Sequence, residues 1–166
     1  MWWVLLLVCG WLILRGRKAS AAEGPVVYID GIFDLFHEGH VQFMKKALAV
    51  GGPGARLLVG VITDEDAGWK REPIMRHTER VSVVKACRHA WGVIEYPPLV
   101  LNEEFIERHK IQFVVHGDDD KQEKFFRIPI EKGIMRYVPY HDGVSTTEIL
   151  KRVRRGMRAS PFNTGA

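Results

Sequence analysis

The stretch Val26-Val-Tyr-Ile-Asp-Gly-Ile-Phe-Asp-Leu-Phe-His-Glu-Gly-His40 decides the fold, because it joins a strand pattern to a helix pattern through a glycine. Its first four residues are apolar and β-rich, which is typical of a strand covered on both faces. Beyond it, Val41, Met44 and Leu48 recur at the spacing of one helical face. The stretch therefore predicts the first strand and the first helix of a parallel α/β sheet.

The rest of the chain repeats this alternation. Further short apolar runs predict strands at 57–62, 92–94, 113–115 and 136–138. Helical patterns lie along 77–91, 102–109 and 122–132, and Pro129 should shorten or bend the last of them. The chain is thus expected to be α/β, with a five-stranded parallel sheet and helices on both faces. Ligands bind such sheets beyond the carboxyl ends of the strands, where the strand order reverses, so functional residues should follow strands one, four and five.

The 166 residues suffice for one domain, which we place at 24–155. Residues 1–23 form an apolar N-terminal segment plus linker, and residues 156–166 are expected to be a disordered basic tail. The apolar run Trp2–Leu14 is shorter than the roughly 20 residues that span a bilayer. A short signal anchor or interfacial segment, a targeting peptide and a mis-assigned start remain alternatives. Basic residues follow the run, which favours a cytosolic position for the domain.

Charge and cysteine content exclude several classes of protein. Basic residues without acidic ones occupy 1–22 and 151–166, whereas 23–150 holds 16 basic and 20 acidic residues. Positive charge at the two ends of an acidic core argues against a nucleic-acid-binding surface. The basic C-terminal segment fits either the solvated end of a helix or a contact with anionic lipid. Cys9 and Cys87 form neither a disulfide framework nor a zinc motif, which favours an intracellular-facing domain.

His37 and His40 are the first candidates for chemistry. They lie three residues apart across a glycine at a predicted helix start, so both imidazoles share one face of the first turn. The unpaired backbone N–H groups of that turn already favour an anion. Histidine donors beside a helix N-terminus suit a phosphate that gains charge during substitution at phosphorus. Near the C-terminus, Ser145-Thr-Thr-Glu148 predicts a capping box that opens a last helix, which is a second place where phosphates can dock.

The motif Gly31-Ile-Phe-Asp-Leu-Phe-His-Glu-Gly-His40 resembles the signature of the cytidylyltransferases that join CTP to a phospho-alcohol. The resemblance covers about residues 25–155 and continues through Lys70, Pro73–Arg80, Cys87–His89, Val115–Asp119 and Gly143–Thr147. It implies a Rossmann-like nucleotidyltransferase fold, in agreement with the strand and helix pattern. It also implies a role in phospholipid biosynthesis, in the cytoplasm or on the cytoplasmic face of a membrane such as the endoplasmic reticulum.

The resemblance implies roles for individual positions. Residues that act on the CTP phosphates would be His37, His40 and Lys70. Other nucleotide contacts would come from Gly31, Ile32, Phe33, Gly39, Arg80, His116, Gly117, Asp118, Ser145, Thr146 and Thr147. Contacts with the phospho-alcohol would come from Asp34 and Tyr140. Arg80 is expected to make a forked phosphate contact, with a surface ion pair to Glu79 or Glu72 as the alternative. Mg²⁺ is expected to arrive bound to CTP, without a metal site of the protein's own.

Two departures from the family pattern matter. The closing motif usually begins with Arg-Thr-Glu-Gly or Arg-Thr-Gln-Gly, but this chain has Tyr140-His-Asp-Gly143. Either His141 or Arg136 replaces the missing arginine, or turnover is impaired. The segment after Asp119 is also shorter than in the choline and ethanolamine enzymes. Phosphoethanolamine is the expected substrate, with phosphocholine, glycerol 3-phosphate or a non-catalytic nucleotide-binding half-domain as alternatives. The resemblance further implies a homodimer whose interface lies next to the first motif.

Overall fold

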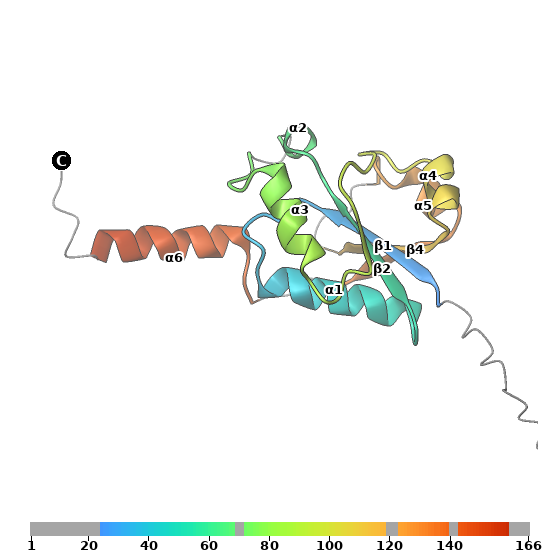
Figure 1. The fold of residues 1–166 in the computed structure, drawn as a ribbon, viewed down its shortest axis with the longest axis horizontal. Helices are drawn as coiled ribbons and strands as arrows, with labels where there is room; N and C mark the ends of the chain where they lie inside the picture. Colours follow the sequence, from blue (N-terminus) through green and yellow to red (C-terminus); the bar gives the residue numbers. More distant parts are fainter. Residues whose placement is uncertain (1–23, 69–71, 119–122, 140–142, 160–166) are drawn as a thin grey trace, which may run out of the picture.

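The computed structural model describes residues 24–68, 72–118, 123–139 and 143–159. Five strands alternate with helices along these residues (Figure 1). The strands are β1 (Val26–Gly31), β2 (Arg56–Val61), β3 (Gly92–Ile94), β4 (Ile111–Gly117) and β5 (Met135–Val138). The helices are α1 (Glu38–Gly51), α2 (Asp64–Ala67), α3 (His77–Lys85), α4 (Glu103–Arg108), α5 (Arg127–Glu131) and α6 (Thr146–Ala159). All five predicted strands are present, which confirms the strand pattern.

The strands form one parallel sheet in the order β3-β2-β1-β4-β5. The chain moves outward from β1 through β2 to β3, and then crosses back so that β4 pairs with the other side of β1. The strand order therefore reverses between β1 and β4. Ligands of open parallel sheets bind at the carboxyl ends of the strands near such a reversal. The predicted functional residues after strands one and four accordingly lie on either side of this point.

Alternate residues of β1 face the two sides of the sheet and enter two separate apolar cores. Val27 and Ile29 join Met44 and Ala47 of α1 in the first core, which also contains residues of α3. Val26 and Tyr28 join Phe105 of α4 in the second core. Because both faces are covered, the first four positions of β1 are all apolar and buried, as the sequence pattern predicted. The predicted α/β class, with helices on both faces, is confirmed.

Several boundaries differ from the prediction, among them the ends of α3 and α6. α3 ends at Lys85 rather than continuing to residue 91, because the chain turns and the Trp91 N–H pairs with the Leu57 carbonyl at the entry to β3. α6 continues to Ala159, beyond the boundary at residue 155 where we expected a disordered tail to follow. By contrast, α5 is short around Pro129, as expected.

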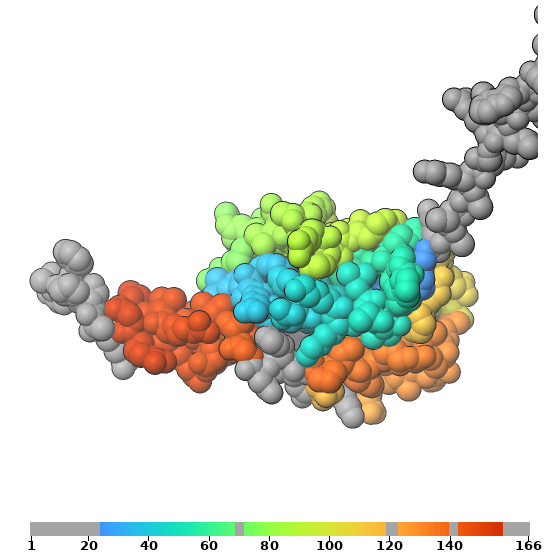
Figure 2. Space-filling model, turned by 90° about the horizontal axis from the view of Figure 1, so that it is seen from below, coloured from blue at the N-terminus to red at the C-terminus, as the bar shows by residue number. Residues whose placement is uncertain are grey.

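Helix α6 extends away from the rest of the domain, as Figures 1 and 2 both show. Only its beginning lies against the domain, and residues 151–157 are all exposed. Val153 and Met157 present apolar side chains on this exposed part. Within the described ranges, no helix combines the length and apolar character that crossing a membrane requires.

Candidate active site

The loop between β1 and α1 has a backbone that ordinary residues rarely adopt. Phe33 and Leu35 have positive φ angles of 53° and 46°, although neither is a glycine. Such conformations cost about 1–3 kcal/mol each and persist where the surrounding structure holds them in place. This loop carries the first motif to the N-terminus of α1, so the unusual backbone lies directly before the two histidines.

His37 and His40 together cap α1. His37 is the N-cap residue, and its Nδ1 accepts the Gly39 N–H at 3.1 Å. In return, Nδ1 of His40 accepts the His37 N–H at 3.2 Å. The two rings stack with their centroids 3.9 Å apart and an interplanar angle of 25°. The pair thus satisfies two backbone donors of the first turn with imidazole nitrogens, in the manner of a capping box.

This capping arrangement sets the tautomer of both rings. A neutral imidazole has one donor and one acceptor nitrogen, and Nδ1 is the acceptor in each case. Both proton-bearing nitrogens are therefore Nε2. Partial burial lowers the pKa of His37 below its ordinary value, so the ring is neutral near pH 7. The N-terminus of α1 thus carries two adjacent imidazole N–H donors, as a phosphate-binding site would require.

Gly39 is required between the two histidines by close approach. A Cβ at this position would lie 2.7 Å from the Val144 carbonyl oxygen and 2.9 Å from Cε1 and Nδ1 of His37. The glycine therefore lets the closing segment of the chain pack directly onto the first turn of α1. As a result, the N-termini of α1 and α6 lie close together.

Asp34 connects three segments of the site. Its side chain is buried, and its two carboxylate oxygens accept the N–H groups of Ile74 and Met75 at 3.1 and 3.0 Å. Its backbone carbonyl accepts the hydroxyl of Thr146 at 3.1 Å. Asp34 was expected to bind the phospho-alcohol, and the structure shows that it also holds the first-motif loop to its neighbours.

The N-terminus of α6 has the serine half of the predicted capping box. The Ser145 hydroxyl oxygen accepts the Glu148 N–H at 3.1 Å. Glu148 pairs with Lys151 at 2.7 Å. The hydroxyl proton of Thr146 is directed to the Asp34 carbonyl, whereas Thr147 is exposed. Of the two threonines that we expected to contact phosphate, Thr147 therefore has the hydroxyl that is more available for it.

Arg80 lies elsewhere than expected. Its side chain is fully buried, so it forms no surface ion pair with Glu79 or Glu72. Its guanidinium donates to the carbonyls of Met75, Ile32 and Ile62 and to the carboxylate of Asp64. These acceptors use four of the five N–H donors of an arginine, which leaves no pair of donors for a forked phosphate contact. Burial alone would raise the pKa of Asp64, but hydrogen bonds from Arg80 and the His77 amide lower it overall.

The end of β4 carries the other predicted nucleotide contacts. His116 and Gly117 are its last residues, and the Asp118 N–H donates to the Val138 carbonyl at 3.1 Å. The His116 ring packs on Phe126 with centroids 5.1 Å apart. On the neighbouring β1, burial raises the pKa of Asp30 to about 6, while the charge of His116 opposes this rise. The chain thus places titratable side chains at the ends of both strands that flank the strand-order reversal.

Two predicted residues, Lys70 and Tyr140, lie outside the described residues, as does His141. Arg136 does not occupy the position of the missing family arginine, because its guanidinium donates to the carbonyls of Gly133 and Met135 at the start of β5.

Sequence reasoning did not single out two charged residues that link separate segments of the chain. Lys46 of α1 donates to the Pro139 carbonyl at 2.6 Å, and no local motif marks it. Asp64 follows β2, and its place after a parallel strand could have identified it.

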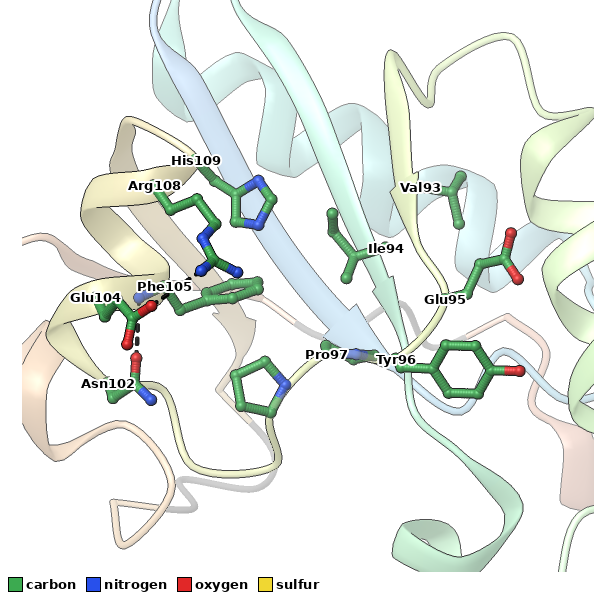
Figure 3. A pocket seen from close by; sticks show the side chains of 11 residues that line it. Val93, Ile94, Glu95, Tyr96, Pro97, Asn102, Glu104, Phe105, Arg108 and His109 are labelled. Carbon is green, nitrogen blue, oxygen red and sulfur yellow. Dashed lines mark hydrogen bonds and ion pairs between the residues drawn. The ribbon is translucent and has the colours of Figure 1, made fainter.

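A separate cavity of about 610 Å³ lies between the end of β3 and α4 (Figure 3). Tyr96, Pro97, Phe105, Arg108 and His109 are among its lining residues. None of the predicted site residues lines it. Among the described residues, no group of three or more His, Cys, Asp or Glu side chains is arranged to hold a metal ion.

Comparison with known proteins gives the same assignment as the residues of the site. The cytidylyltransferase-like sequence profile matches residues 28–152. Human choline-phosphate cytidylyltransferase A is 34% identical over 147 residues, which cover 85% of this chain and 40% of that protein. Ethanolamine-phosphate cytidylyltransferase of Dictyostelium discoideum is 37% identical over 148 residues, with 84% and 40% coverage. The chain thus spans about two fifths of the length of these relatives.

The fold also matches a solved structure. The lipopolysaccharide core biosynthesis protein from Thermoplasma volcanium superposes with a TM-score of 0.59 at 19% identity, covering 72% of this chain and 99% of that one. This match shows that the parallel α/β fold of the chain also occurs in that protein. The sequence profile extends from β1 into α6 and so includes the histidine pair and the closing segment. On these grounds the chain belongs to the cytidylyltransferase-like family.

Proposed function

We propose that this chain transfers a cytidylyl group from CTP to phosphoethanolamine. A phosphate oxygen of phosphoethanolamine forms a bond to the α-phosphorus of CTP, and the bond from that phosphorus to the bridging oxygen of the β-phosphate breaks. CDP-ethanolamine forms and pyrophosphate leaves with the electron pair of the broken bond. The phosphate of the substrate is itself the nucleophile, so the reaction needs no covalent enzyme intermediate.

The stacked pair of His37 and His40 carries this proposal. Substitution at phosphorus places additional negative charge on the oxygens of the reacting phosphate. Two neutral imidazoles with protons on Nε2, fixed at the N-terminus of α1, supply donors in a preorganised arrangement. The backbone already holds both rings in position, so little reorganisation is needed when charge develops.

The remaining roles follow the family resemblance. Lys70 supplies a point charge to the phosphates. Ser145 caps the N-terminus of α6, and Thr147 contacts the β- and γ-phosphates there. His116, Gly117 and Asp118 contact the nucleotide at the end of β4. Further contacts come from Gly31, Ile32 and Phe33 of the first-motif loop, and Tyr140 contacts the phospho-alcohol.

Mg²⁺ would enter as its complex with CTP. The donors at the histidine pair are N–H groups, which suit phosphate oxygens and not a cation. The buried carboxylate of Asp34 already accepts two backbone N–H groups. This donor set fits a nucleotide whose own phosphate oxygens hold the metal.

The test is a turnover assay on the full chain, with Mg²⁺, CTP and one of phosphoethanolamine, phosphocholine or glycerol 3-phosphate. Pyrophosphate release is followed, and the double variant His37→Ala/His40→Ala is the blank. Turnover with phosphoethanolamine that the blank loses is the expected result. Turnover with phosphocholine or glycerol 3-phosphate alone would reassign the substrate, and the absence of turnover with all three would refute the proposed reaction.

One observation favours a second function, that of a non-catalytic nucleotide-binding module. Arg136 is engaged with two carbonyls at the start of β5 and does not replace the missing family arginine. For such a module, CTP would raise the melting temperature of the full chain without any pyrophosphate release. The same assay, accompanied by a thermal shift measurement, separates the two functions.

A homodimer belongs to the proposal as well. The resemblance implied an interface next to the first motif, but we place it at β3. This is an edge strand, and large apolar side chains are exposed around it, namely Trp91, Tyr96 and Val100. Exposed apolar groups near a sheet edge support an interface with a second copy. Sedimentation of the wild type and of Tyr96→Glu should show a dimer that the variant weakens. An unchanged monomer in both would refute this part of the proposal.

We also propose that the chain contacts the cytoplasmic face of a membrane through residues 2–18. Those residues lie outside the described ones, but α6 supports a membrane contact. It exposes Val153 and Met157 next to the basic Lys151, Arg152 and Arg154, a combination found in helices that lie on anionic lipid. Co-sedimentation of the full chain with vesicles is the expected outcome, more strongly with anionic vesicles, which also attract the basic residues of α6, than with neutral ones. Recovery of all the protein in the supernatant would contradict it.

A further inference from the structure

Arg80 is the largest fully buried side chain among the described residues. A buried charge is tolerated only where hydrogen bonds and an opposite charge compensate for the lost water. Arg80 has hydrogen bonds to four different residues, and one of these, Asp64, carries the opposite charge. Nε donates to the Met75 carbonyl at 3.2 Å, and Nη2 donates to the Ile62 carbonyl at 2.8 Å and to Asp64 Oδ1 at 2.7 Å. Nη1 donates to the Ile32 carbonyl.

These acceptors come from three separate segments that meet at the carboxyl end of the sheet. Ile32 follows β1, and Ile62 follows β2. Met75 belongs to the segment before α3, and that segment is also bound by the first-motif loop. The N–H of Met75 donates to Asp34, and its carbonyl accepts from Arg80. The first-motif loop and the segment before α3 are therefore joined twice at Met75, through its N–H by Asp34 and through its carbonyl by Arg80.

The bond to Ile32 lies directly before the unusual part of the loop. Phe33, the next residue, has a φ of 53°, and Leu35 has a φ of 46°. Both conformations need external support to persist. Three sets of hydrogen bonds support this loop. Arg80 donates to the Ile32 carbonyl, two backbone N–H groups donate to the Asp34 carboxylate, and the Thr146 hydroxyl donates to the Asp34 carbonyl. His37, which caps α1, follows two residues after Leu35.

We propose that Arg80 is a positioning residue, which holds the loop from Ile32 to Phe36 so that His37 and His40 keep their capped, Nε2-protonated arrangement. This inference rests on the proposed transfer reaction for its kinetic consequences, but its structural part does not. Arg80 makes no contact with phosphate in this role, because its donors are already divided among three carbonyls and Asp64. It affects the reaction only by fixing the positions of the His37 and His40 imidazoles.

The first test compares Arg80→Lys with wild type. Lysine keeps the positive charge but has only three N–H donors on one nitrogen, so it cannot make the four hydrogen bonds of Arg80. A positioning role predicts a kcat lowered by about 10²-fold, with a KM for CTP unchanged within about twofold. Arg76→Lys is the matched control, because Arg76 is an exposed arginine at the N-cap of the same helix that pairs with Glu79. It should leave both constants unchanged. A phosphate ligand would instead give a raised KM for CTP with kcat largely retained, which would overturn the proposal.

The second readout does not depend on activity. Imidazole ¹⁵N spectra of the wild type without CTP should show unprotonated Nδ1 for both His37 and His40. Arg80→Lys should disturb these signals, whereas Arg76→Lys should not. Unchanged histidine spectra in a folded Arg80→Lys would refute the inference even if the chain has no transferase activity. If the wild type shows the expected spectra but no turnover, the proposed reaction fails and the positioning role is still tested.

A milder variant covers the case in which Arg80→Lys does not fold. Asp64→Asn changes a side chain that is about half exposed and weakens only one of the four contacts of Arg80. It should lower kcat by a smaller factor in the same direction and shift the same histidine signals. An Asp64→Asn variant with unaltered kcat and spectra would count against the proposal.

Discussion

Nδ1 of His40 accepts the backbone N–H of His37 at 3.2 Å, so the second histidine of the motif fixes the backbone at the first. His37 returns a cap to the Gly39 N–H, and the two rings stack. Each imidazole thus has a structural role at Nδ1, which places its proton on Nε2. The two roles of each ring can be separated by substitution.

His37→Asn tests this separation. Asparagine is a favoured N-cap residue, so it should retain the cap and the stability of the chain. His37→Ala should lower the free energy of unfolding by about 1 kcal/mol. Both variants lose the Nε2 donor, and kcat should fall by about 10²–10³-fold in each. Chemical denaturation and the pyrophosphate assay measure the two effects, and an active His37→Asn would show that the imidazole donor is dispensable.

The activity should have an acidic limit set by His37. Because burial lowers the pKa of His37, the folded chain keeps this ring neutral at pH values where the unfolded chain is partly protonated. Its contribution to stability is therefore complete above about pH 6.5 and declines as the pH falls towards the lowered pKa. A second proton would have to occupy Nδ1 and would remove the cap to Gly39. We expect kcat to fall with the fraction of neutral His37, as followed by NMR titration. A titration above the ordinary value would contradict this.

Asp30 should give the opposite pH dependence of stability. Burial raises its pKa from 3.8 to about 6, so the folded chain binds a proton more tightly than the unfolded chain does. Stability is therefore lost as the pH rises through this window, and the loss is complete above about pH 6. Asp30→Asn removes the penalty and should stabilise the chain by at most about 3 kcal/mol at pH 8, but not at pH 4. Thermal unfolding at both pH values measures the difference, and an equal effect at both would refute the explanation.

Gly39→Ala should disrupt the contact between the two helix N-termini. The added Cβ would lie 2.7 Å from the Val144 carbonyl oxygen, which cannot move without the closing segment. We expect a loss of about 1–3 kcal/mol of stability and about 10²-fold in kcat. Gly156→Ala in α6 is the matched control, because nothing lies within 4 Å of its Cβ position. That change should be neutral or should stabilise the helix by up to about 1 kcal/mol.

The sequence predicted those features that depend on local patterns. The strands were evident because both faces of the sheet are covered, and the histidine pair was evident because its spacing places both rings on one helical turn. Arg80 was misjudged for a physical reason. A charged residue in a polar stretch is normally exposed, and only the three-dimensional meeting of Ile32, Ile62 and Met75 supplies the carbonyls that allow its burial. The different environments of Thr146, which donates to the Asp34 carbonyl, and of the exposed Thr147 likewise depend on packing between distant segments.

Thr146 and Thr147 should respond differently to the loss of their hydroxyl groups. A hydroxyl has one proton to donate, and that of Thr146 is directed to the Asp34 carbonyl at 3.1 Å. Thr146→Val should therefore weaken the support of the first-motif loop, lowering stability by about 1 kcal/mol and kcat, with little change in the KM for CTP. Thr147 is exposed at the N-terminus of α6, so its hydroxyl is available to phosphate.

Thr147→Val should accordingly raise the KM for CTP about five- to tenfold and leave stability unchanged, since a hydrogen bond to a charged group is worth about 1.5–3 kcal/mol before any replacement by water. Thr146→Ser, which keeps the hydroxyl, should behave like the wild type. Steady-state kinetics over a range of CTP concentrations, together with denaturation of the same samples, separates the two effects. If Thr146→Val raised the KM for CTP while Thr147→Val lowered stability, the hydroxyl of Thr146 would bind phosphate in the working enzyme, and its bond to Asp34 would not be the functional one.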